Sequence, residues 1–376
     1  MVQKVCDLVE RLAVLPDPRR QCANLKHKFV DVLVLGCCGV LADCDDFVQI
    51  AAWANLHLDF FRTFLELPHG SPSHDTLTRV FALAKPATLQ GVLVPWLQQR
   101  RGLPGEWIHL DGKAMRHTRR ASTGLKNLHV VSAWASQSGL TLGQVAVDSK
   151  SNEITAFPQL LELLDLRDKV VTIDAMGCQK DIAAAVVAGG GDYVLAVKDN
   201  QPTLHADIQA AFATKEAASP SRRGVTTVEE SHGRLERRTV RVLPASTVAS
   251  HQSAWVGLLT LVMVASEVTC QATGVLSREV RYFISSLPRP SARRMGQVIR
   301  SHWSIENGLH WVLDVVFHED ARRVYDRTVA ENTALLNRLA VSLLRGDPSK
   351  DSLTVKRKRA GWDVHYLAQL LGFLGT

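Results

Sequence analysis

Asp111 is the residue whose setting most clearly calls for a chemical explanation. It lies in residues 107–113 (WIHLDGK), whose alternation predicts a β-strand with Asp111 on the face opposite Ile108 and Leu110. Strands are depleted in Asp. A carboxylate here is therefore expected to have a strong partner, such as an Arg, a Lys or a divalent metal ion. The alternative is a strand that simply ends and turns to solvent at Asp-Gly.

A second carboxylate, Asp174, has the same kind of position. Residues 170–173 (VVTI) predict a short apolar strand that ends at Asp174, and a helix over 179–188 leads to the next apolar strand. Strands joined by crossover helices are parallel and buried. If strand 170–173 lies beside the first strand, Asp111 and Asp174 face each other at one edge of the sheet. The two carboxylates would repel each other unless a cation lay between them, which is the geometry of a magnesium site.

The third candidate acid is Glu306, in a segment over 291–316 whose apolar residues recur near helical spacing. One turn away along such a helix lie His302, Trp303, Leu309 and His310. A carboxylate between two histidines and a tryptophan, on an otherwise apolar helix, indicates a functional group. A structural salt bridge, for example to Arg300, is the alternative interpretation.

The elements that position these acids fall into five segments. They are an N-terminal helical domain over residues 1–101, a first part of the core over 106–199, a β-rich insertion over 200–290, a second part of the core with the third acid over 291–345, and a basic C-terminal tail and helix over 346–376. The first segment is expected to serve packing or dimerisation rather than to read DNA by a helix-turn-helix.

The core is expected to begin with strands over residues 107–115, 128–136 and 140–147, the last two joined as an antiparallel hairpin by the turn Gln137-Ser138-Gly139. The insertion contains a basic hairpin tip at 232–238 (HGRLERR), and the tail contains the basic run 356–359 (KRKR). Both basic stretches suit phosphate contacts. A solvated turn is an equal alternative for the tip, and a run such as 356–359 is more often simply solvated.

Composition narrows the function classes. The 376 residues carry a net charge of +7, which favours an anionic partner, with nucleic acid first and an anionic membrane surface second. The seven cysteines are scattered without paired CxxC motifs, which argues against zinc and fits a reducing cytoplasm. No signal peptide or membrane span is predicted. Without a GxGxxG motif, a Rossmann-like nucleotide enzyme has little support.

Six motifs in a characteristic order and spacing carry a family resemblance. They are LDGK at 110–113, KSNEI at 150–154, TIDAMGCQ at 172–179, YVLAVK at 193–198, HWSIEN at 302–307 and LHWVLDV at 309–315. With these motifs, roughly residues 17–345 resemble the insertion-sequence transposases of the ISAs type, which include the H-repeat-associated proteins. These are DDE transposases with an RNase H-like core, so the resemblance implies an α+β fold in which that mixed-sheet core is interrupted by the β-rich insertion and flanked by N-terminal helices and C-terminal helices.

The resemblance also implies a site and a reaction. Asp111, Asp174 and Glu306 match the three catalytic acids, which would hold Mg²⁺, or Mn²⁺ in its place, for cleavage at element ends and strand transfer into target DNA. The partner would be double-stranded DNA bound by a homodimer, in a bacterial cytoplasm at the nucleoid. The residues expected to contact DNA are Lys113, Arg116, Lys198, Arg234, Arg300, His302, Trp303 and His310.

One departure from the family concerns phosphate binding. Related families carry a Tyr, an Arg and a Lys around the third acid, and these positions fall here on Ile299, His302 and Leu313. Arg300, His310 or Lys113 are the expected substitutes, with Arg119 and Arg120 as further basic neighbours of the first acid. Two functions compete with transposition: an RNase H-like nuclease that cuts without joining strands, and an inactive DNA-binding relic.

Overall fold

The computed structural model describes residues 7–20, 25–102, 105–119, 124, 126–148, 153–218, 224–231 and 233–372. Arg120, residues 150–152 of the KSNEI motif and His232 lie outside this described part. The chain forms two compact units. The first comprises Met1–Pro104, Gly112–Asn152 and Glu306–Thr376, and the second comprises Gly105–Asp111 and Glu153–Ile305. The five segments expected from the sequence stay a prediction, since their boundaries are not those of the two units.

The first unit is mostly helical. Its helices are α1 (Asp7–Ala13), α2 (Phe29–Leu41), α3 (Phe47–Leu56), α4 (Leu58–Phe61), α5 (His74–Leu83), α6 (Pro86–Arg101), α12 (Trp311–Val315), α13 (Arg327–Gly346), α14 (Leu353–Trp362) and α15 (Val364–Leu371). Helix α2 is buried almost throughout because its residues are apolar on all sides, as expected for a core helix. Ser73 caps α5 by accepting a hydrogen bond from the Thr76 backbone N–H.

Three strands complete the first unit, in the order β3-β2-β1. Strand β1 (Trp107–Met115) belongs to this unit from Gly112 onward. Strands β2 (Leu128–Ala135) and β3 (Leu140–Val147) pair antiparallel, which confirms the predicted hairpin. Helix α13 covers this sheet, because Ala330 and Ala334 pack against Met115, Leu128 and Val130.

The second unit contains the parallel part of the sheet. Strand β1 up to Asp111 pairs in parallel with β4 (Val170–Ile173), and β4 pairs in parallel with β5 (Asp192–Val197). The crossovers run through α7 (Glu153–Glu162) and α8 (Lys180–Ala188). The orders β3-β2-β1 and β1-β4-β5 give three antiparallel strands followed by two parallel ones. This confirms the α+β fold with an RNase H-like mixed sheet.

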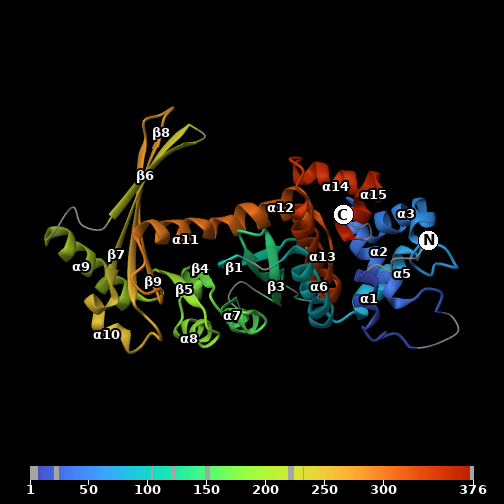
Figure 1. The fold of residues 1–376 in the computed structure, drawn as a ribbon, viewed down its shortest axis with the longest axis horizontal. Coiled ribbons are helices and arrows are strands. Elements are labelled where there is room, and N and C mark those ends of the chain that lie inside the picture. The colour runs from blue at the N-terminus through green and yellow to red at the C-terminus, as the bar shows by residue number, and fades with distance from the viewer. Residues whose placement is uncertain are drawn as a thin grey trace. The chain divides into compact units, whose positions relative to one another are not determined.

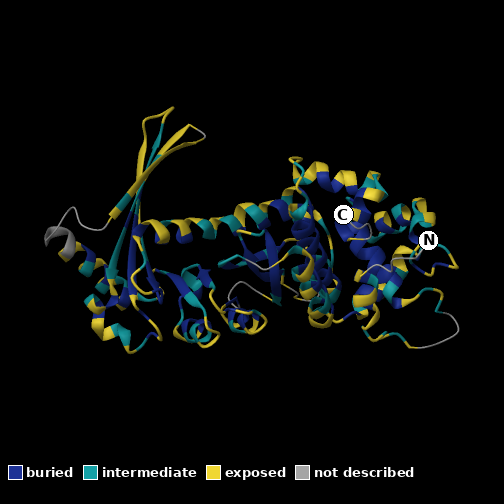
Figure 2. Ribbon diagram, in the orientation of Figure 1, coloured by how far each residue is buried: buried dark blue, intermediate teal, exposed yellow. Residues whose placement is uncertain are grey.

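The insertion extends the same sheet. Its strands are β6 (Gly224–Ser231), β7 (Arg234–Pro244), β8 (Thr260–Cys270) and β9 (Leu276–Ser285), a meander in which β9 also pairs antiparallel with β5. The strands of this meander extend past the rest of the second unit (Figure 1), and there they are largely exposed (Figure 2), as in β6. The insertion also has helices α9 (Pro202–Ala218) and α10 (Ala249–Gln252).

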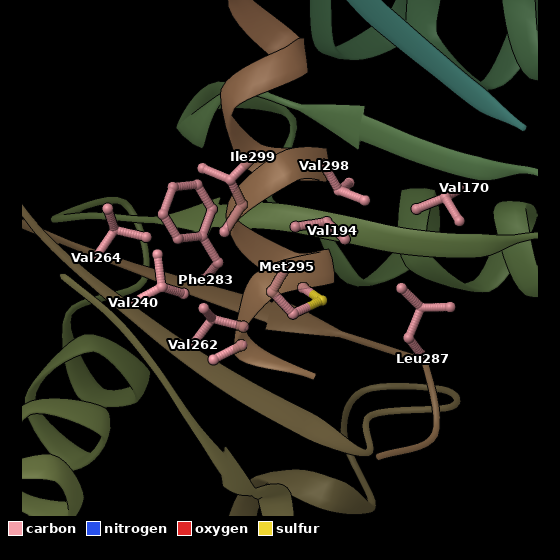
Figure 3. Packing of buried hydrophobic residues seen from close by; sticks show 11 residues of the cluster. Val170, Val194, Val240, Val262, Val264, Phe283, Leu287, Met295, Val298 and Ile299 are labelled. Atoms are coloured by element: carbon pink, nitrogen blue, oxygen red, sulfur yellow. The ribbon is translucent and has the colours of Figure 1, made fainter. Parts of the chain in front are cut away.

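The core of the second unit forms where α11 (Ala292–Ile305) crosses the sheet. Met295 and Val298 of α11 are fully buried against strand residues such as Val194, Val262 and Phe283 (Figure 3). Among the described residues, no single helix is long and apolar enough to cross a bilayer, and only the pair α5 and α6, bent by 95°, meets the length and composition of a broken span.

Candidate functional site

Asp111 and Asp174 lie at equivalent positions of adjacent parallel strands. In the β1–β4 pairing, Leu110 stands opposite Ile173, so the next residue of each strand is an aspartate. Both aspartates are half-buried: Asp174 directly follows β4, and Asp111 lies within β1, just past the last residue that pairs with β4. This pairing meets the condition under which the two acids were expected to face each other.

The Asp174 carboxylate is held by the backbone that follows it. Its Oδ1 accepts hydrogen bonds from the N–H groups of Met176 at 3.1 Å and Gly177 at 3.4 Å, and thereby caps the 3₁₀ turn η3 (Ala175–Gly177). Gly177 permits this tight turn, since a Cβ there would come within 2.2 Å of Ile173 Cγ2. The glycine of the TIDAMGCQ motif thus serves the placement of the acid.

Behind the two aspartates, one hydroxyl joins two histidines. Thr172 Oγ1 lies 2.6 Å from His109 Nδ1 and 2.7 Å from His302 Nδ1. Burial, together with the nearby His302 ring, lowers the pKa of His109 to about 3. Burial also lowers the pKa of His302 to about 4, although the Asp174 charge opposes this shift. Both rings are therefore neutral at pH 7.

Glu306 belongs to the first unit and is exposed. The predicted helix over 291–316 is continuous but changes its winding here: α11 ends at Ile305, the π-helical segment η5 (Glu306–His310) follows, and α12 begins at Trp311. Such π-helical turns inside α-helices occur frequently at functional sites. Glu306 is the first residue of this segment.

The donor set can be compared with the needs of a metal ion. Among the residues that the structure describes, no group of three or more His, Cys, Asp or Glu side chains is arranged to hold one. Carboxylate oxygens are nevertheless the ligands that hard divalent cations prefer. The paired Asp111 and Asp174 fit such an ion by ligand type.

Lys113, expected to contact DNA, is instead committed to protein carboxylates. Its ammonium lies 2.7 Å from Asp314 Oδ1, 2.9 Å from Asp320 Oδ1 and 3.5 Å from Glu319 Oε2, and its side chain is only 7% exposed. Burial by itself would lower the pKa of Lys113, but the carboxylates, Glu319 foremost, raise it above its usual value. In this structure the cation is engaged by carboxylates, and its contact with DNA stays a prediction.

The Lys113 cluster continues into a second buried ion pair. Arg338 and Glu319, both 0% exposed, lie 3.2 Å apart, and Arg338 Nε donates to Ser132 Oγ at 2.8 Å. Asn337 Nδ2 also donates to Glu319 at 3.2 Å. The sequence had indicated only a charged turn at 317–323, and nothing local in it distinguished a buried Glu319 from an exposed one.

The other residues expected to contact DNA differ in accessibility. Lys198, Arg116, Arg234, Arg300 and Trp303 are exposed, whereas His302 and His310 are partly buried. Arg116 is paired with Asp320 at 3.2 Å, Arg300 is paired with Glu229, and Trp303 lies beneath the Arg281 guanidinium at 6.0 Å.

The basic run at 356–359 is only partly a surface feature. Lys356 donates to the Asp347 backbone carbonyl at 2.7 Å, and Arg357, 1% exposed, pairs with Asp43 at 3.2 Å and Asp45 at 3.1 Å. These two cations hold α14 to the rest of the first unit. Only Lys358 and Arg359 of the run are exposed.

Comparisons with known proteins agree over almost the whole chain. Residues 102–343 match the family model described as Transposase DDE domain, and residues 9–97 match the DDE_Tnp_1-associated model. The H repeat-associated putative transposase YhhI of Escherichia coli (strain K12) is 35% identical over 373 residues, 98% of each chain. The putative transposase YncI of Escherichia coli O157:H7 is 35% identical over 371 residues, 97% of this chain and 94% of the relative.

Among solved structures, the chain aligns with the transposase in a piggyBac transposase synaptic complex with hairpin DNA. The alignment covers 98% of this chain and 77% of that chain, with a TM-score of 0.42 and 9% sequence identity. The family assignment depends on the sequence comparisons, since the DDE domain model spans more than half of the chain and full-length relatives align with it from end to end. The chain therefore belongs to the DDE transposase family, whose members are enzymes that act on DNA.

Proposed function

We propose that this protein is a DNA transposase that cleaves DNA at the ends of its element and joins those ends to target DNA, with Asp111, Asp174 and Glu306 as its metal-binding acids. Family membership supports an enzyme that acts on DNA. The observation that carries the site is the register of β1 and β4, in which Asp111 and Asp174 follow the paired residues Leu110 and Ile173.

The proposed cofactor is Mg²⁺, with Mn²⁺ as a substitute, because both ions favour carboxylate oxygens. A bound pair of such ions lowers the pKa of an attacking water and stabilises the leaving oxygen of a phosphodiester. The contribution of the chain is to orient the ligands. The backbone N–H groups of Met176 and Gly177 fix the rotamer of Asp174, and the pairing of β1 with β4 up to Leu110 and Ile173 fixes the spacing of the two backbones where Asp111 and Asp174 follow.

The proposed partner is double-stranded DNA, both the element ends and the target, bound by a homodimer in the DNA complex. Exposed cations suit contacts to the phosphate backbone, which supply most of the affinity of such complexes. Arg234 opens β7 at the exposed end of the insertion, and Lys198 directly follows β5. Exposed Trp303 offers an aromatic surface on the last turn of α11.

The test is cleavage of a supercoiled plasmid that carries the ends of the element, with Mg²⁺, with Mn²⁺ and with EDTA. We expect metal-dependent cuts at the element boundaries and a loss of more than about a hundredfold in Asp174→Asn, because second-shell changes alone cost about 10–100-fold. Asp192→Asn is the matched control. Asp192 is the first residue of β5 and accepts a hydrogen bond from Ser286 Oγ at 2.6 Å. It stands opposite Val170, at the amino end of β4, whereas Asp174 follows the carboxyl end of that strand.

Each outcome discriminates between the functions. Cutting followed by joining to a second plasmid supports the transposase, and cutting without joining supports a nuclease. Binding of the ends without cutting in either metal supports an inactive relic. If Asp174→Asn cuts as well as the wild type, the assignment of the acids is wrong.

A further inference from the structure

The hydroxyl of Thr172 occupies an unusual position in the second unit. It contacts a ring nitrogen of His109 on β1 and a ring nitrogen of His302 on α11, so three elements meet at one oxygen atom. Thr172 is only 2% exposed and His109 is fully buried. Hydrogen bonds at 2.6 and 2.7 Å in such a setting are expected to be well formed, since water is excluded from Thr172 and His109.

The strand positions connect this bridge to the proposed acids. His109 precedes Asp111 by two residues and Thr172 precedes Asp174 by two residues, and residues two apart in a strand lie on the same face. The bridge is therefore on the face of the sheet from which both carboxylates extend. His302 lies in the last turn of α11, directly before the segment that begins with Glu306.

The number of hydrogen-bond donors at Thr172 constrains which nitrogen of each histidine ring carries the proton. A threonine hydroxyl donates one hydrogen bond, and a neutral imidazole has one N–H and one acceptor nitrogen. In the described part of the chain, Thr172 Oγ1 forms its side-chain hydrogen bonds with the Nδ1 atoms of His109 and His302. For the hydroxyl both to donate and to accept, one ring must carry its proton on Nδ1 and the other on Nε2. Two Nδ1–H donors would leave the buried hydroxyl hydrogen without an acceptor in the bridge, so the bridge favours opposite tautomers of His109 and His302.

The bridge adds something that the apolar core does not provide. Met295, Val298 and Ile299 hold α11 on the sheet through apolar contacts (Figure 3), which are non-directional. Hydrogen bonds weaken steeply as their angles change. The Thr172 bridge therefore fixes the rotation and the height of the last turn of α11 relative to the two strands.

We propose that Thr172 is a positioning residue of this enzyme: by holding His109 and His302 in opposite tautomers, its hydroxyl sets the last turn of α11 against β1 and β4 next to Asp111 and Asp174. The inference rests on the proposed function, because those aspartates are the proposed metal ligands. Thr172 itself touches no reacting atom.

Thr172→Val keeps the shape of the side chain and removes both hydrogen bonds, and Thr172→Ser keeps the hydroxyl. The matched control is Thr260→Val. Thr260 is a buried threonine on β8, and its hydroxyl donates a hydrogen bond to the Leu287 carbonyl at 2.8 Å. Strand β8 is three strands away from β4 in the sheet. Full-length variants are compared by thermal unfolding, by Mn²⁺ binding in calorimetry, by binding of element ends and by plasmid cleavage.

We expect Thr172→Val to weaken Mn²⁺ binding or slow cleavage by about 10–100-fold, the range seen when outer-shell partners of metal sites are removed. Binding of the element ends should stay within about twofold. Thr172→Ser should restore most of the loss. The unfolding temperature of Thr260→Val should be as low as that of Thr172→Val. Its Mn²⁺ binding and its cleavage rate should equal those of the wild type. If Thr172→Val also binds Mn²⁺ and cuts like Thr260→Val, the positioning role is refuted.

A second readout separates this inference from the proposed function. If the wild type neither binds Mn²⁺ nor cuts, the proposed function fails, and ¹⁵N spectra of the histidine rings still report the tautomers. Opposite tautomers of His109 and His302 in the wild type, lost in Thr172→Val and regained in Thr172→Ser, would support the bridge. The same tautomer in both rings would overturn it.

Discussion

Replacing Glu319 by Gln removes one negative charge from the centre of the Lys113 cluster. Glu319 lies 3.2 Å from the Arg338 guanidinium and 3.5 Å from the Lys113 ammonium. At these distances each attraction is about 5 kcal/mol for an effective dielectric constant of 20, before desolvation. Lys113 retains Asp314 and Asp320 after the change, whereas Arg338 loses the only carboxylate paired with it in the described chain.

The expected cost follows from the burial of Arg338. Desolvation offsets much of the attraction in an intact buried pair, but removal of one partner leaves a buried charge uncompensated, at a cost of about 3–5 kcal/mol. We expect Glu319→Gln to lower the free energy of unfolding by that amount in a urea titration followed by circular dichroism. The control is Asp148→Asn, which removes an exposed carboxylate paired with the half-buried Arg327 in the same unit and should cost less than about 1 kcal/mol.

The pH dependence gives a second readout. Burial alone would raise the pKa of Glu319, but Arg338 foremost, with Lys113, outweighs burial and holds the pKa below its usual value. The stabilisation is therefore present above the unfolded pKa of about 4.3 and is lost as the pH falls through the lower folded pKa. Glu319→Gln should remove this part of the acid sensitivity. A loss of less than about 1 kcal/mol at pH 7 would refute the assignment of a buried charge cluster.

Two further substitutions test the core and the turn beside Asp174. Met295→Ala should lower the free energy of unfolding by about 2–5 kcal/mol, because Met295 is fully buried between α11 and the sheet, while Val280→Ala at the exposed part of β9 should change it by less than about 0.5 kcal/mol. Denaturant titration measures both, and equal effects would contradict the packing. Gly177→Ala should cost about 1–3 kcal/mol through the clash with Ile173, and should slow cleavage by displacing Asp174. Gly91→Ala in α6, where a Cβ meets nothing within 4 Å, should stabilise the protein by up to about 1 kcal/mol. Normal stability and cleavage in Gly177→Ala would show that the turn tolerates a side chain.

Much of the secondary structure was predictable because its signals are local. The alternation of residues 107–115 and the apolar run 170–173 correspond to β1 and β4 at the predicted bounds. The long α9 was missed, although Leu204, Ile208 and Phe212 recur every four residues and are buried. The interpretation of residues 200–290 as β-rich passed over that helical spacing.

Charged side chains were harder to place than strands. Lys113, Lys356 and Arg357 resemble exposed phosphate-binding cations in sequence, because basic residues are usually exposed. In the structure, Lys113 pairs with carboxylates near residue 320, and Arg357 pairs with Asp43 and Asp45. Burial of a cation depends on a partner supplied by another part of the chain, and no local pattern identifies that partner.

The sequence by itself determined the bounds of β1 and β4 and the position of an aspartate in the first and directly after the second, whereas their adjacency in the sheet was a condition that the structure had to supply. Alternation defines a strand, a crossover helix makes its neighbour parallel, and both rules act over short stretches of chain. The tertiary structure alone decided the Thr172 bridge and the Arg338 contact to Ser132, because these join residues 63, 130 and 206 positions apart. Such contacts form only after the sheet and helices have packed, and their geometry is set by that packing.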